Sequence, residues 1–237
     1  MFYPKIQSLW KRDMSKKGII IPGELSMPEF GSINHWNVTE KIDGMNVRVI
    51  YDHKEEKVTF NGRTDRAQMP VNLMKSLHAQ FNYPHMASQL GLDKLTLFGE
   101  GYGAGIQKGG GYIKEDQDFI LFDVYNWNHD YWLPCEDVMT MAKTLHIKCV
   151  PWIGVMSTDD AIEEAKSLFC SSISEDKNKK AEGIVATSCP HLFNARGHRI
   201  RWKLKAKDFE HLEQMEAQER KENNKQNEGL VDALQLS

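Results

Sequence analysis

Lys41 is the residue whose surroundings in this chain best suit nucleophilic chemistry. It lies in segment 40–46, EKIDGMN, which places an amine, a carboxylate and a flexible backbone close together. A lysine amine has an ordinary pKa of about 10.4 and must lose its proton before it attacks phosphorus, which neighbouring cations and partial burial favour. Gly44 would let the backbone approach a phosphate, and Asp43 could hold the metal ion of a nucleoside triphosphate. The segment predicts transfer of AMP from ATP, although a surface β-turn would have the same composition.

The residues after this segment predict a β-hairpin. Apolar side chains alternate with others over residues 47–51, which is the two-residue period of a strand. Residues 54–57 are charged and predict a turn, and residues 58–60 predict the returning strand. Lys41 is therefore expected at the start of a hairpin arm.

The middle of the chain predicts further strands and helices around a glycine-rich segment. A strand is expected at 95–98, and glycine-rich residues 99–112 follow it. The next expected element is another strand, at 119–124, so the glycines do not form a dinucleotide-binding fingerprint, which requires a helix there. Apolar spacing predicts helices at 71–90, 135–147 and 158–170, the last with a cap at residues 157–158.

A cationic strand is expected near the C-terminus. Residues 171–180 predict a loop, and residues 183–186 predict a buried strand that Glu182 precedes. Residues 198–207 alternate apolar with basic side chains, so one face of the expected strand is cationic: Arg199, Arg201, Lys203, Lys205 and Lys207. Like charges on one face destabilise a strand unless an anion meets them, but a solvated edge strand protected by lysines would have the same pattern.

The composition is that of a globular protein. The chain has 237 residues, 41% hydrophobic and 27% charged, and a net charge of −3, so any surface for nucleic acid must be a local patch. No apolar run reaches the ~20 residues that span a bilayer, and the first residues do not resemble a signal peptide, so a cytoplasmic protein is expected. The four cysteines form no zinc-binding pair and are expected to be reduced core thiols.

Five motifs in order resemble those of the covalent nucleotidyltransferases, which include polynucleotide ligases and RNA-capping enzymes. They are the Lys41 box, Glu100 after a strand, Phe119 with Phe122 and Asp123, Glu182 with Gly183, and Lys203 with Lys205. Asn46, Arg63 and the segment 98–108 are similar to the phage RNA ligases that seal nicks in duplex RNA. The resemblance implies an α+β fold, with two mainly antiparallel sheets, flanking helices and a central nucleotide cleft. This domain is expected at 1–207, followed by a short polar helical or disordered tail at 208–237.

The resemblance also implies an ATP-dependent RNA ligase. Lys41 would form a lysyl-AMP intermediate, AMP would pass to a 5′-phosphate end, and a 3′-hydroxyl would displace it. Asp43 and Glu182 would hold Mg²⁺ or Mn²⁺, and Lys203 and Lys205 would act catalytically on the phosphates. Glu100 would bind a ribose hydroxyl and Phe119 would stack on adenine. The residues implied at the nucleotide are Glu40, Lys41, Asn46, Arg63, Glu100, Phe119, Glu182, Lys203 and Lys205.

Two features depart from the family pattern. Many members carry a basic residue soon after the Glu-Gly of the fourth motif, whereas residues 184–187 are IVAT. The phage relatives have a helical C-terminal domain, and DNA ligases have an OB domain, where this chain has only residues 208–237. The partners expected are RNA ends, among them nicked duplex RNA, with an accessory protein for RNA grip.

Two alternatives stay open. A minimal ATP-dependent DNA ligase is one, although Asn46 stands where DNA ligases usually carry arginine. The other is a catalytically silent module that binds a nucleotide or RNA. The location would be the host cytoplasm if the source is viral.

Overall fold

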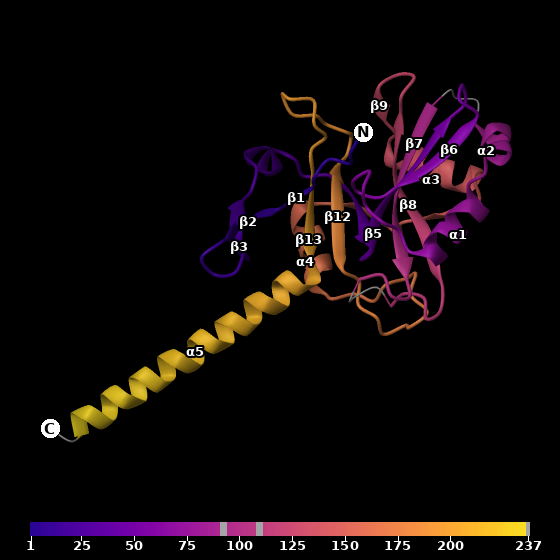
Figure 1. Ribbon diagram of the computed structural model, residues 1–237. Coiled ribbons are helices and arrows are strands. Elements are labelled where there is room, and N and C mark those ends of the chain that lie inside the picture. Colours follow the sequence, from indigo (N-terminus) through magenta and orange to yellow (C-terminus); the bar gives the residue numbers. More distant parts are fainter. Residues whose placement is uncertain (91–93, 108–110, 236–237) are drawn as a thin grey trace.

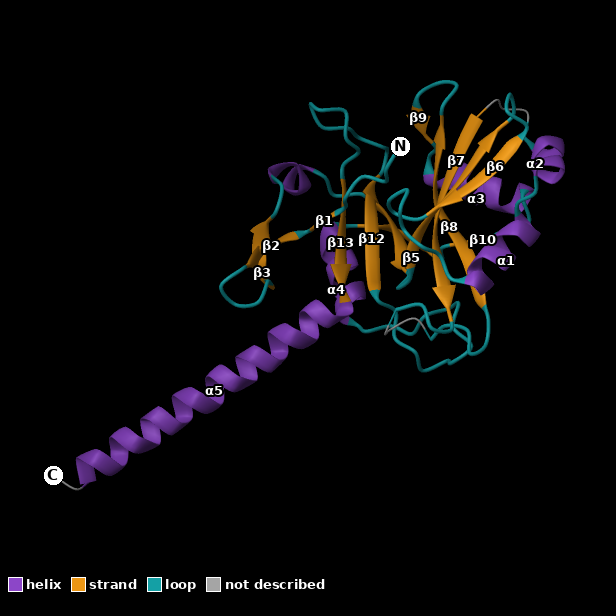
Figure 2. Cartoon of the chain, in the orientation of Figure 1, coloured by secondary structure: helices purple, strands orange, loops and turns teal. Residues whose placement is uncertain are grey.

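Two β-sheets pack together and carry helices on their outer faces (Figures 1 and 2). Residues of both sheets line a cleft between them. The computed structural model describes residues 1–90, 94–107 and 111–235, with residues 219 and 222–235 described by their backbone alone. Neighbouring strands are antiparallel in both sheets, except for one short parallel pair in each. This architecture confirms the predicted α+β class.

The first sheet carries the Lys41 strand at its interior. It has five strands in the spatial order β1 (Gln7–Ser8), β13 (Arg201–Lys205), β12 (Gly183–Ser188), β4 (Trp36–Lys41) and β11 (Trp152–Met156). A small hairpin of β2 (Trp10–Asp13) and β3 (Ile19–Leu25) lies next to it. Helix α4 (Thr158–Lys166) and the 3₁₀ helix Pro28–Ser32 contribute to its core, in which Trp36 and Trp202 are fully buried.

The second sheet forms the opposite wall of the cleft. It contains β10 (Lys148–Cys149), β8 (Gln117–Asn126), β7 (Lys94–Gly103), β5 (Met45–Asp52) and β6 (Lys57–Asn61), with β9 (Tyr131–Trp132) beside β8. Three helices pack on its outer face: α1 (Val71–Gln80), α2 (Tyr83–Gln89) and α3 (Cys135–Thr144). Because β7 is covered on both faces, nearly all of its residues are buried.

The structure refines several element boundaries. The helix expected at 71–90 is two helices, because Asn82 caps a new one and Pro84 occupies its first turn. The strand expected at 95–98 continues through the first glycines to Gly103, where they pair with β5 and β8. The helices expected at 135–147 and 158–170 end earlier, at Thr144 and Lys166.

Helix α5 (Ala206–Gln235) is longer than the sequence indicated. It begins inside the strand expected at 198–207 and points away from the body of the molecule in Figure 1. Two contacts hold the first turn of α5 against the domain. The ring centroid of Phe209 lies 5.9 Å from that of Trp10. Asp208 accepts hydrogen bonds from Arg12 at 2.6 and 3.1 Å. The first turns are therefore part of the folded domain.

The cysteines and helices allow two further comparisons with expectation. All four cysteines are free, as predicted, but Cys170 is exposed and is not a core thiol. None of the helices in the described part of the chain combines the length and apolar character needed to cross a membrane.

Candidate active site

Strand β4 presents alternate side chains to the cleft, and its last residue is Lys41. Val38 is fully buried in the core, whereas Thr39 and Lys41 line a cavity of about 220 Å³ between the two sheets. This alternation is the two-residue period of a strand. Lys41 therefore lies in the cleft, as its motif predicted.

Glu40 borders the same cavity, but its carboxylate is engaged elsewhere. It is 2% exposed and accepts hydrogen bonds from the hydroxyl of Ser171 and from the backbone nitrogen of Ser172, the latter at 3.3 Å. Burial raises the pKa of this carboxyl, and the serine hydrogen bonds oppose the rise. The Glu40 carboxylate therefore holds the loop at Ser171 and Ser172, and the predicted role of Glu40 at a nucleotide stays a prediction.

Glu182 joins two of the motif lysines. Its carboxylate lies 2.5 Å from Nζ of Lys41 and 2.6 Å from Nζ of Lys205. The register explains this arrangement, because Gly183 pairs with Lys41 on one side of β12 and with Lys205 on the other. Burial alone would raise the pKa of Glu182, but the two ammonium groups outweigh it and hold the pKa below its usual value.

The glycines of these motifs are required by close packing of strands. Gly183 has a φ of +148°, and a Cβ there would overlap the carbonyl oxygen of Leu204. A Cβ on Gly44 would overlap the carbonyl oxygen of Gly101 and the side chain of Glu100. Gly44 therefore permits the close approach of its turn to β7, and the approach of its backbone to a phosphate stays a prediction.

Lys203 is the motif lysine whose charge is least compensated. It is half-buried on β13 opposite Val185, and it has no ion-pair partner among the residues that the structure describes. Burial and the positive charges of Lys41 and Lys205 lower its pKa to about 8. An anion in the cleft would therefore stabilise the protonated form of Lys203.

Glu100 on β7 faces the lysines from the second sheet. Burial raises the pKa of Glu100 to about 8, opposed by the charge of Lys41 and assisted by those of Glu182 and Asp43. Its carboxyl therefore carries a proton at neutral pH. A protonated carboxyl can donate one hydrogen bond and accept another, so Glu100 suits a hydroxyl ligand.

Binding of an unreactive ATP analogue should weaken as the pH rises through about 8. Lys203 loses its positive charge there and Glu100 gains a negative one, and each change disfavours a triphosphate. We expect affinity for α,β-methylene-ATP to fall roughly tenfold for each group between pH 7 and 9. Calorimetric titrations of the native chain, Lys203→Arg and Glu100→Gln would measure this fall. Each variant should lose about half of the native pH dependence. If the affinity of the native chain does not change with pH, Lys203 and Glu100 do not titrate near pH 8 at the binding site.

Part of the cavity wall is apolar. Ile42, Phe122, Val150 and Val185 line it, with Phe122 from one sheet and Val185 from the other. Phe119 does not take part: it is fully buried on the helical side of β8, with its ring centroid 5.2 Å from that of Phe81. Phe122, and not Phe119, therefore lies at the cavity, because residues three apart on a strand point to opposite faces.

Two further predicted residues line the cavity. The Oδ1 atom of Asn46 is buried without a hydrogen-bond partner in the described structure, so it can accept a hydrogen bond from a ligand. Arg63 follows β6 and is exposed at the same cavity. In the glycine-rich segment Gln107 is exposed, whereas Lys108 lies outside the described residues.

The predicted metal ligands are close to one another without forming a closed metal centre. Asp43 and Glu182 both add to the shift of the pKa of Glu100, so the three carboxyl groups share one region. In the described residues no three His, Cys, Asp or Glu side chains are arranged to hold a metal ion. A cation that keeps several waters and contacts few carboxylates, as Mg²⁺ does, suits this arrangement.

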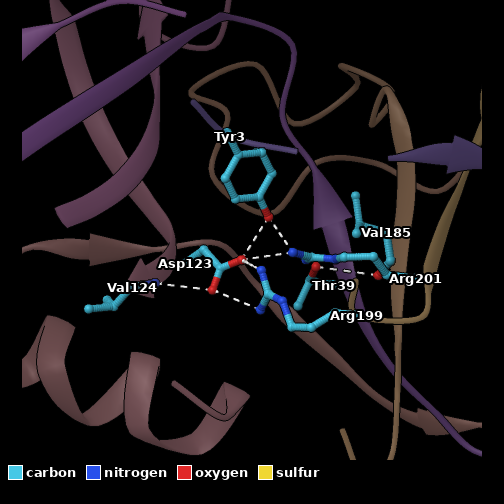
Figure 3. A network of polar contacts seen from close by, with 7 residues as sticks. All are labelled: Tyr3, Thr39, Asp123, Val124, Val185, Arg199 and Arg201. Atoms are coloured by element: carbon cyan, nitrogen blue, oxygen red, sulfur yellow. Dashed lines mark hydrogen bonds and ion pairs between the residues drawn. The ribbon is translucent and has the colours of Figure 1, made fainter. Parts of the chain in front are cut away.

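Tyr3 and Arg201, which line the cavity, belong to a buried polar network that the sequence did not reveal (Figure 3). Asp123 accepts two hydrogen bonds from Arg199, at 3.1 and 2.5 Å, one from Arg201 at 2.7 Å and one from the hydroxyl of Tyr3 at 2.7 Å. Arg201 also donates to the Tyr3 oxygen. The charge pattern of residues 198–207 contained a signal for this network, but its partner Asp123 is 76 residues away from Arg199.

The cationic row is therefore divided among three surroundings. Arg199 and Arg201 share the carboxylate of Asp123 within the protein, with side chains only 5% and 14% exposed. Lys203 lines the cavity, Lys205 pairs with Glu182, and Lys207 is exposed on α5. Of the five basic side chains, two are thus directed to the lysine and carboxylate cluster.

The comparison with protein families decides the affiliation of this fold. The profile of the RNA ligase family matches residues 34–205, which include every motif described above. The chain belongs to the RNA ligase family. No curated protein matches it in sequence.

Solved structures of a Naegleria gruberi RNA ligase have a similar fold. A mutant without ligand is 19% identical with a TM-score of 0.59, covering 87% of this chain and 57% of that one. A mutant with AMP and Mn is 18% identical with a TM-score of 0.61, covering 87% and 58%. A mutant with ATP and Mn is 18% identical with a TM-score of 0.59, covering 88% and 61%. The chain thus spans about three fifths of the length of these ligases.

Proposed function

We propose that this chain is an ATP-dependent RNA ligase that joins 5′-phosphate and 3′-hydroxyl ends through a lysyl-AMP intermediate on Lys41. The observation that carries the proposal is the position of the Lys41 amine, which lies in the cleft, pairs with Glu182 and is close to Lys203 and Lys205. Membership of the RNA ligase family supports RNA as the acceptor, and the Naegleria gruberi ligase structures with AMP or ATP support the nucleotide.

In the first step Lys41 would take AMP from ATP. Its Nζ attacks the α-phosphorus, a nitrogen–phosphorus bond forms, and the bond to the β-phosphate oxygen breaks with release of pyrophosphate. Glu182 Oε2, which lies 2.5 Å from Nζ, is placed to accept the proton that the amine loses. Lys203 and Lys205 would neutralise the charge that develops on the phosphates.

The later steps would move AMP to RNA and release it. An oxygen of the RNA 5′-phosphate attacks the same phosphorus, and the bond to Lys41 breaks and restores the amine. The 3′-hydroxyl of the second end then attacks the 5′-phosphorus, and AMP leaves. Asn46 and Arg63 line the cavity and are proposed to serve these steps.

The remaining groups suit binding of the nucleoside and the metal ion. Phe122 and Val185 would sandwich the base, and the carboxyl of Glu100 would exchange hydrogen bonds with a ribose hydroxyl. Asp43 and Glu182 would hold Mg²⁺ or Mn²⁺ through water. The cation would supply charge neutralisation to the triphosphate.

The test is incubation with Mg²⁺ and ATP labelled at the α-phosphate, followed by denaturing electrophoresis. The expected result is label that stays on the protein, is released by acid, and maps by mass spectrometry to the peptide containing Lys41. Nucleotide binding without label would favour a silent binding module. Label followed by sealing of nicked DNA in preference to nicked RNA would favour a minimal DNA ligase.

A further inference from the structure

The first eight residues connect the two walls of the cleft. At one end the carbonyl oxygen of Met1 accepts a hydrogen bond from Arg48 on β5, and the ring of Phe2 lies 4.9 Å from the guanidinium of Arg48. At the other end β1 (Gln7–Ser8) pairs in parallel with β13. The segment between them, residues 3–6, lines the cavity that contains Lys41.

Tyr3 contacts both sheets through its hydroxyl and its ring. Its hydroxyl donates to Asp123 on β8 and accepts from Arg201 on β13, so it bridges the two sheets (Figure 3). Its ring packs edge-on against Phe122, with 4.9 Å between centroids, and contacts Phe98 at 5.0 Å. Tyr3 thus touches two side chains that line the nucleotide cavity, Phe122 and Arg201.

Arg201 has a hydrogen-bond donor that the protein does not satisfy. Its Nη1 group serves Tyr3 and Asp123, whereas its Nε is buried without a partner in the described structure. Folded proteins rarely leave buried donors unpaired. Because Arg201 lines the cavity, its guanidinium can meet an acceptor on a ligand bound there, and ring nitrogens of a nucleobase are acceptors of the required kind.

We propose that Tyr3 is a positioning residue of the nucleotide pocket, holding Arg201 through its hydroxyl and Phe122 through its ring so that both meet the base of ATP. The inference rests on the proposed function. A side chain held by packing and by a second hydrogen-bonded residue binds its ligand in one geometry without first losing rotamer freedom. Loss of Tyr3 should therefore weaken ATP binding more than it slows the chemical step at Lys41.

The experiment measures the rate of self-adenylylation against ATP concentration for the native chain, Tyr3→Phe and Tyr3→Ala. Tyr3→Ala should raise the half-saturating ATP concentration about tenfold and change the limiting rate by less than about threefold. Tyr3→Phe keeps the ring and should raise the half-saturating concentration only about threefold. The matched control is Tyr83→Ala, because Tyr83 stacks on Tyr51 and His53 outside the cavity and should leave both quantities unchanged.

A double-mutant cycle tests whether Tyr3 acts through Arg201. If it does, the half-saturating ATP concentration of the double variant Tyr3→Phe, Arg201→Lys should equal that of Arg201→Lys alone. The inference is overturned if Tyr3→Phe and Tyr3→Ala lower the thermal midpoint yet leave the half-saturating ATP concentration at its native value. If the native chain takes no label, the proposed function fails instead, and binding of α,β-methylene-ATP to the same variants then decides the role of Tyr3.

Discussion

Lys41→Arg is expected to lower the rate of protein labelling by α-labelled ATP at least about 1,000-fold, because a guanidinium stays protonated and cannot attack phosphorus. Arginine keeps the positive charge beside Glu182, which lies 2.5 Å from the present amine, so the ion pair can persist. The loss would therefore reflect the missing nucleophile and not a collapsed site. The measurement is labelled protein on a denaturing gel, over times from seconds to hours.

Two controls make this result specific. Lys207→Arg changes an exposed lysine of α5 and should label at the native rate. Lys41→Arg should still join RNA supplied with a 5′-adenylylated end, because that step has already received its AMP. Persistent labelling of Lys41→Arg would place the nucleophile on another residue and would remove the basis of the proposed mechanism.

Asp123→Ala is expected to lower the free energy of unfolding by about 3–5 kcal/mol, because it leaves buried guanidinium groups without their shared carboxylate. Arg199 and Arg201 both pair with Asp123, and the three side chains are 5%, 14% and 3% exposed. Tyr3 would lose the acceptor of its hydroxyl as well. Urea unfolding of the native and variant chains at pH 7 measures the difference.

The pH dependence of this difference has a definite sign. Burial alone would raise the pKa of Asp123, but Arg199 and Arg201 outweigh it and lower the pKa below its ordinary value of 3.8. The stabilisation is therefore complete above that ordinary value and is lost as the pH falls through the folded-state pKa. The native and variant chains should differ by a constant amount between pH 5 and 8 and converge below pH 4. The control Asp116→Ala removes an exposed carboxylate and should change stability little.

Local patterns were sufficient to predict most elements that carry the site. The alternation after Lys41 predicted the hairpin of β5 and β6, and apolar spacing predicted the start of α1 and both ends of α3 and α4 to within a few residues. The predicted helix boundaries were wrong where a local pattern is compatible with more than one structure. Division of the helix expected at 71–90 into two helices could have been predicted only by recognising Asn82 as a helix cap. The length of α5 could not be predicted, because its sequence is polar and has few apolar residues.

The choice between Phe119 and Phe122 shows why site residues are harder to predict than elements. Both aromatics lie on the same strand, and the sequence indicates that strand clearly. Which face meets the cleft depends on the packing of α1 against β8, which buries Phe119 beside Phe81. A one-residue change of register would exchange the two faces, so strand prediction alone cannot assign the stacking residue.

The sequence by itself determined the chemical groups of this protein: a lysine in a tight turn, carboxylates before and within buried strands, and two lysines on one strand face. These follow from local order along the chain, and their types suit nucleotide and phosphate transfer. Only the tertiary structure decided how the charges are shared. Arg199 and Arg201 pair with Asp123, and Lys41 and Lys205 both pair with Glu182. Lys203 has a lowered pKa. The physical reason is that pairing and desolvation depend on distances between strands that are remote in sequence.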